Sequence, residues 1–159
     1  MKNQIKNIEI KVGLLTSLTL ILYFLFMKLV DLIQIVELRA LNIFILLGGV
    51  YVAFYYERKQ THSNIEYFRG LLLGILTALY AIIPFSLFVF FYLREIDPYL
   101  IRVLQSHTIL IGVKITLEIV AESILIEGIV SGVLITFILM QYYRAGFNDP
   151  VKKQESFEG

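Results

Sequence analysis

The hydrophobic positions of this chain gather in four long runs, which short charged segments separate. An α-helix rises about 1.5 Å per residue and the hydrocarbon core of a bilayer is about 30 Å thick, so about 20 apolar residues make one crossing. The runs therefore predict four transmembrane helices, over residues 12–30, 38–56, 68–93 and 124–143. The second run is short and needs Leu38 or its aromatic end to reach this length. We expect an all-α membrane protein that folds as a four-helix bundle.

Composition supports this class. The hydrophobic fraction is 58% of 159 residues, above the roughly 45–50% that is usual for soluble proteins. A net charge of +1 gives no sign of a nucleic-acid partner, and the absence of cysteine excludes disulfides and thiolate sites. We expect one membrane domain over residues 1–147 and a polar cytoplasmic tail over residues 148–159.

The amino terminus has two interpretations. A basic segment followed by the first apolar run is typical of a cleaved signal peptide, but this run is long and no small-x-small cleavage pattern follows it. We therefore expect a retained first helix.

Basic residues predict the orientation. Nine of them lie on the side of the termini and five on the other side, so the positive-inside rule places both termini in the cytoplasm. The nine are Lys2, Lys6, Lys11, Arg58, Lys59, Arg69, Arg144, Lys152 and Lys153; the five are Lys28, Arg39, Arg94, Arg102 and Lys114.

The segment over residues 98–123 does not resemble a span. It follows the cap-and-proline pair Asp97-Pro98, and Lys114, Glu118 and Glu122 recur at every fourth position. This spacing predicts an amphipathic helix on the outer side, either lying on the interface or folded over the bundle. It either shields the helix ends or forms a surface for a substrate or partner.

Small residues recur four apart in each predicted span. In lipid, such pairs let helix backbones approach closely. The clearest sets are Gly70/Gly74/Ala78 and Gly128/Gly132, which serve either contacts inside the bundle or a dimer seam. Pro84 removes a backbone hydrogen bond from the third span, which predicts a kink that shapes the bundle or acts as a hinge.

Glu127 is the acidic residue placed deepest, about one turn inside the fourth predicted span. With Glu122 and Glu118 it suggests a line of acids that binds a cation or relays protons. The simpler interpretation is an interfacial carboxylate paired with Lys114 or Arg94. Ion-pair or proton-relay candidates are thus Glu127, Glu122, Glu118 and Lys114.

Catalytic patterns are missing from the sequence. His62 and His107 are predicted on opposite sides of the membrane, and no phosphate-binding glycine loop occurs. A lipid-modifying enzyme that uses His107, Glu122 and Glu127 is the only enzymatic alternative. We expect no enzyme activity, cofactor or metal.

Four motifs carry a family resemblance: Lys11-Val12-Gly13, Tyr67-Phe68-Arg69-Gly70, Ile96-Asp97-Pro98-Tyr99 and the Gly128–Gly132 helix with its basic end. With them, residues 8–145 resemble the bacterial membrane proteins of the domain-of-unknown-function family numbered 4199. The resemblance implies a four-helix protein of the bacterial inner membrane with a longer loop before the last helix. It implies no activity and no functional residue.

Two functions follow as hypotheses. The first is an accessory or interaction subunit that packs against itself or a larger membrane partner. The alternative is a small proton- or ion-coupled carrier that uses Glu127.

The predicted topology can be tested with single cysteines, because the chain has none. We expect an impermeant thiol reagent to label Ser106→Cys and not Ser63→Cys in intact cells. Labelling of Ser63→Cys alone would reverse the orientation.

Overall fold

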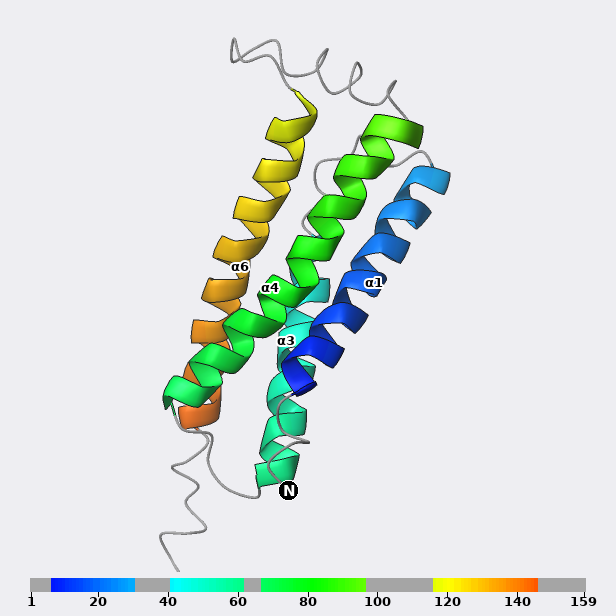
Figure 1. The fold of residues 1–159 in the computed structure, drawn as a ribbon. Coiled ribbons are helices and arrows are strands. Elements are labelled where there is room, and N and C mark those ends of the chain that lie inside the picture. The colour runs from blue at the N-terminus through cyan, green and yellow to red at the C-terminus, as the bar shows by residue number, and fades with distance from the viewer. Residues whose placement is uncertain (1–6, 31–40, 62–66, 97–115, 146–159) are drawn as a thin grey trace, which may run out of the picture.

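The computed structural model describes residues 7–30, 41–61, 67–96 and 116–145. The elements in order are α1 (Ile8–Leu29), α3 (Leu41–Thr61), α4 (Tyr67–Phe91), the short π-helix η2 (Tyr92–Ile96) and α6 (Leu117–Ala145). Consecutive long helices run antiparallel (Figure 1). We call the end at which α1 ends and α3 begins the upper end, as drawn in Figure 1, and the opposite end the lower end. The all-α class is confirmed.

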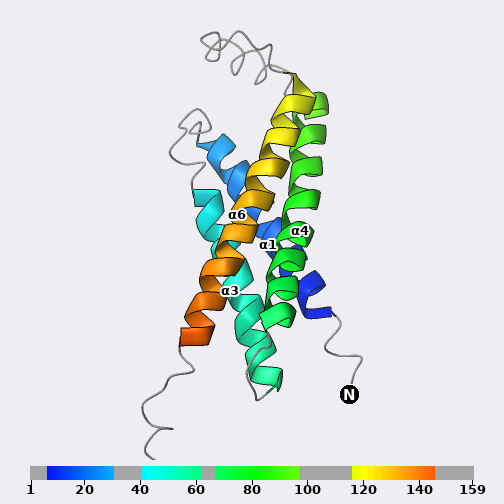
Figure 2. The same ribbon diagram turned by 90° about the vertical axis from the view of Figure 1, so that its left-hand side faces the viewer.

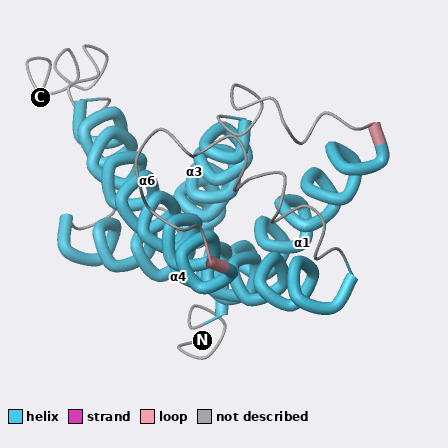
Figure 3. Tube along the Cα trace, turned by 90° about the horizontal axis from the view of Figure 1, so that it is seen from above, coloured by secondary structure: helices cyan, strands magenta, loops and turns pink. Residues whose placement is uncertain are grey.

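Helix α4 is the centre of the bundle. It packs against α1, α3 and α6, whereas α3 fills the space between α1 and α6 (Figures 2 and 3). Its small and apolar positions are buried, among them Gly70, Gly74, Ala78 and Ala81. Pro84 lies inside α4, and the helix continues past it. The kink expected there stays a prediction.

Within the described residues, three helical segments are long and apolar enough to cross a membrane: Ile8–Leu29, Tyr67–Ile96 and Leu117–Tyr143. Helix α3 has 21 residues but is not among them, because its described part includes Asn42 and the charged Glu57-Arg58-Lys59 run. The predicted span over residues 38–56 is therefore not confirmed, and its first three residues lie outside the described part of the chain.

Glycines form the closest helix contacts. A Cβ atom at Gly49 of α3 would meet Thr16 of α1, and one at Gly74 of α4 would meet Thr136 of α6. Each threonine donates its hydroxyl to its own helix, Thr16 to the Val12 carbonyl at 2.8 Å and Thr136 to the Gly132 carbonyl at 2.7 Å. The polar group is thus satisfied locally, and the rest of the side chain occupies the space that the glycine leaves.

The same close packing holds α4 against α6 higher up. A Cβ at Gly128 would lie 2.6 Å from the Ile82 side chain, and one at Gly132 would lie 2.5 Å from the Cβ of Ala78. Near the upper end, the Ser86 hydroxyl donates to the Ala121 carbonyl at 2.9 Å. The small residues singled out in the sequence therefore lie between helices of one chain.

The surface of the bundle is apolar between two charged ends. Large side chains such as Leu15, Phe26 and Ile138 are each more than 60% exposed. Most of the described charged side chains lie near the ends, among them Glu57, Arg58, Lys59 and Arg69 at the lower end, and Lys28, Arg94, Glu95, Glu118 and Glu122 at the upper end. An apolar surface of this extent between charged rims is typical of a membrane protein.

Helix α6 begins earlier than the sequence indicated. It starts at Leu117 and continues without a break to Ala145, whereas the predicted span began at residue 124 and assigned residues 117–123 to a separate amphipathic segment. Because Leu117 and Val120 pack against the core of the bundle, tertiary contacts extend the helix by about two turns. Residues 98–115, with Lys114 and His107, lie outside the described residues.

Substitution of Gly74 tests the contact between α4 and α6. Gly74→Leu places a side chain where Thr136 lies, and overpacking of this kind costs about 1–3 kcal/mol. We expect a clearly lower melting temperature in detergent for Gly74→Leu and little change for Leu72→Ile, which is exposed on the same helix. Equal melting temperatures for Gly74→Leu and the unchanged protein would contradict the contact.

Candidate functional site

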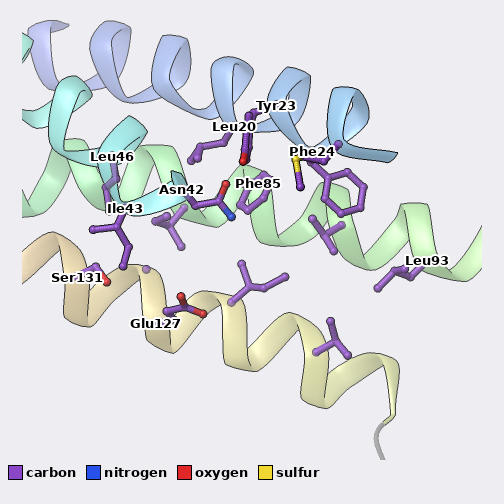
Figure 4. Close-up of a pocket in the computed structure, with 16 residues that line it drawn as sticks. Leu20, Tyr23, Phe24, Asn42, Ile43, Leu46, Phe85, Leu93, Glu127 and Ser131 are labelled. Carbon is purple, nitrogen blue, oxygen red and sulfur yellow. The ribbon is translucent and has the colours of Figure 1, made fainter. Parts of the chain in front are cut away.

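A cavity of about 130 Å³ lies in the upper half of the bundle. The first described turns of α3, which starts at Leu41, border the cavity through Asn42, Ile43 and Leu46. All four long helices contribute to the lining (Figure 4). The cavity thus lies where the described parts of the four helices come together.

The polar residues of the lining come from three helices. Tyr23 lies on α1, Asn42 in the first turn of α3, and Glu127 and Ser131 on α6. Ser131 follows Glu127 by four residues, so both side chains lie on one helix face. In Figure 4, Glu127 points from α6 toward the side on which Asn42 lies.

Asn42 and Glu127 differ in their surroundings. The Oδ1 atom of Asn42 is buried and has no hydrogen-bond partner in the described part of the chain. The Glu127 side chain is exposed and also takes part in an interaction within the chain, as does Tyr23. An amide oxygen and a carboxylate both accept hydrogen bonds, so a ligand with hydrogen-bond donors can pair with these two groups.

The remaining lining is apolar and aromatic. Toward the upper end it consists of Phe24, Met27, Val89, Leu93, Val120 and Ile124. Phe24 contacts Phe85, Phe88 and Tyr92 edge-on, with ring centroids 5.3–6.5 Å apart. A concave apolar wall with a few polar groups at one end is the usual composition of a small-molecule site.

The three acids of α6 do not form the line that the sequence suggested. Because α6 is continuous from Leu117, Glu127 lies five residues beyond Glu122, a rotation of about 140° around the helix axis. Glu118 and Glu122 share an exposed face, whereas Glu127 alone of these three lines the cavity. The predicted relay along all three acids is therefore wrong, and Glu127 is the one carboxylate of the three at the cavity.

Glu127 also lies farther along its helix than the sequence predicted. It lies ten residues, nearly three turns, after the first residue of the helix, rather than one turn inside it. Arg94, one of its predicted partners, pairs with Glu95 at 3.3 Å.

A second polar site lies at the lower end. The Arg69 Nε atom of α4 donates to the Glu57 Oε1 atom of α3 at 3.0 Å, and the Glu57 side chain is only 5% exposed. Beside it, Tyr143 of α6 stacks on Phe54 with ring centroids 5.5 Å apart, and the Arg58 guanidinium lies 5.8 Å from the Tyr143 ring. These contacts join α3, α4 and α6 below the cavity.

Sequence reasoning singled out Glu127 but missed Tyr23, Asn42, Ser131 and the buried Glu57. Asn42 interrupts an apolar run, and Ser131 follows Glu127 by four residues, a spacing that places both on one helix face. Both positions could therefore have been identified from the sequence. Glu57 adjoins Arg58 and Lys59 in the sequence, and its burial beside Arg69 of the next helix appears only in the structure.

Comparison with known proteins adds no assignment: no protein-family model matches the chain, and no curated protein or solved structure is significantly similar to it.

Removal of Arg69 tests the lower polar site. Arg69→Gln removes the positive charge that lies 3.0 Å from the buried Glu57 carboxylate. Because Arg69 itself is 39% exposed, we expect a loss of about 1–3 kcal/mol, below the cost of breaking a fully buried pair.

The matched control is Arg94→Gln, whose pair with Glu95 is 59% and 70% exposed and should contribute less than about 1 kcal/mol. Chemical denaturation in detergent measures both variants. A loss for Arg69→Gln no larger than that for Arg94→Gln would contradict the structural role of the pair.

Proposed function

We propose that this chain is a four-span protein of a bacterial cytoplasmic membrane that acts as a non-catalytic accessory or interaction subunit. Both termini face the cytoplasm, α3 is the second span, and the segment before α6 lies on the outer surface. The partner is a second copy or a larger membrane protein. Membership of the family numbered 4199, which the sequence motifs suggest, belongs to the same proposal.

The observation that carries this proposal is the outward direction of Gly48. Gly13, Gly49, Gly74, Gly128 and Gly132 each face a neighbouring helix, whereas a Cβ at Gly48 would meet nothing within 4 Å in the described part of the chain. Small residues on a membrane helix typically allow another helix to pack closely. A glycine that no described residue approaches therefore favours a helix from another chain.

The residues around Gly48 fit this use. Phe44, Tyr51 and Tyr55 lie on the same face of α3, at spacings of four, three and four residues, and are 66%, 43% and 52% exposed. We call Phe44, Gly48, Tyr51 and Tyr55 the α3 outer face. Aromatic side chains beside a small residue form a ridge next to a groove, into which a second helix can pack. Aromatic residues are also enriched at protein interfaces.

A carrier that uses Glu127 is the second candidate, because Glu127 lines a cavity. Transport also requires a path through the lower half. There the structure is closed: Val50, Phe54, Thr77 and Thr136 are each fully buried. This closed lower half supports a packing role more than transport by alternating access.

Gly48→Leu tests the proposed interface. We expect the free energy of unfolding to stay within about 0.5 kcal/mol, because the new side chain meets no described neighbour. A photo-crosslinking residue at Phe44 should give a defined adduct in membranes, and Gly48→Leu should abolish it.

Two controls sharpen the result. Thr19→Leu enlarges an exposed position of α1 and should leave the adduct intact. A crosslinker at Leu22, which is 59% exposed on α1, should not give the same adduct. An adduct that survives Gly48→Leu, or that forms equally from Leu22, would refute the α3 outer face as the interface.

A further inference from the structure

The cavity of the upper half combines acceptor groups at one end with hydrocarbon walls at the other. We propose that it binds a small amphiphilic amine, a molecule with one protonated amino group and a short apolar body. This inference goes beyond the proposed packing role and does not depend on it, since the α3 outer face and the cavity lie on different residues.

The acceptors define the polar end of the ligand. The Asn42 Oδ1 atom is buried without a partner in the described residues, and the Glu127 carboxylate and Ser131 hydroxyl line the same cavity. A carboxylate offers about four acceptor positions, so Glu127 can accept from a ligand in addition to its interaction within the chain. An ammonium group supplies three donors and a complementary charge.

Other head groups fit less well. A carboxylate ligand would place like charges together beside Glu127, which costs free energy in a site of low dielectric. An alcohol offers one donor and no charge, so it satisfies fewer of the acceptors. Lys28, which follows the lining residue Met27 on α1, has its ammonium 5.1 Å from the centre of the Tyr92 ring.

The walls define the apolar end. Met27, Val89, Leu93, Val120 and Ile124 present aliphatic or thioether surface toward the upper end of the bundle. An apolar cavity of about 150 Å³ holds one benzene molecule, so 130 Å³ suits a ligand with a short apolar body, for which a chain of about six carbons is the upper limit. The polar group of the ligand then lies deeper than its hydrocarbon part, the reverse of a lipid in the upper leaflet.

Binding of hexylamine to the full chain in phosphatidylcholine nanodiscs tests the proposal, with empty nanodiscs as the partition control. We expect saturable binding, competition by excess unlabelled hexylamine, weaker binding of hexanol and none of hexanoate. Nuclear Overhauser contacts from hexylamine to the Val89 and Ile124 methyl groups should locate it.

Two variants assign the recognition to Glu127. Glu127→Gln should weaken hexylamine binding by about tenfold or more, because a charge-assisted hydrogen bond becomes a neutral one, and should leave hexanol binding within about twofold. Glu122→Gln, on the exposed face of the same helix, should change neither. Absence of saturable hexylamine binding, equal binding of hexanoate, or unchanged affinity in Glu127→Gln would overturn the proposal.

Discussion

The fold depends on glycines that let a neighbouring threonine side chain come close to a helix backbone. In lipid there is little hydrophobic drive between helices, so association relies on close packing and satisfied polar groups. Thr16 against Gly49 joins α1 to α3, and Thr136 against Gly74 joins α6 to α4. Because each threonine hydroxyl bonds to its own helix, the contact leaves no unpaired donor at the interface.

These contacts also explain where the bundle is open. The Gly49 and Gly74 contacts hold the lower half closed, and the Glu57–Arg69 pair secures its end. In the upper half, α4 still packs on α6 through Gly128 and Ile82, but the described part of α3 stops at Leu41. The cavity lies in this upper half, and its polar groups are those that α1, α3 and α6 bring to the same level.

Much of this architecture is readable from the sequence, because length and periodicity decide it. The apolar runs indicate the positions of the helices, and the Gly70/Gly74/Ala78 and Gly128/Gly132 spacings mark residues that lie between helices in the structure. The sequence pattern was wrong about the start of α6, since Glu118 and Glu122 resemble the rim of a span although the helix continues through them.

The candidate site was less predictable, since it depends on where helices lie relative to one another. Glu127 stood out as an acid in an apolar run, but its separation from Glu118 and Glu122 follows only from an unbroken helix. Asn42 and Ser131 reach the cavity from different helices, and no local pattern pairs them. Likewise, the burial of Glu57 depends on a partner twelve residues away across a connection.

The most direct test of the account is a nuclear Overhauser measurement on the threonine methyl groups, with isotope-labelled protein in nanodiscs. The account predicts contacts from the Thr136 methyl group to the Gly74 α-protons and from the Thr16 methyl group to the Gly49 α-protons. Contacts from these methyl groups to lipid acyl chains, in place of the glycine protons, would contradict it.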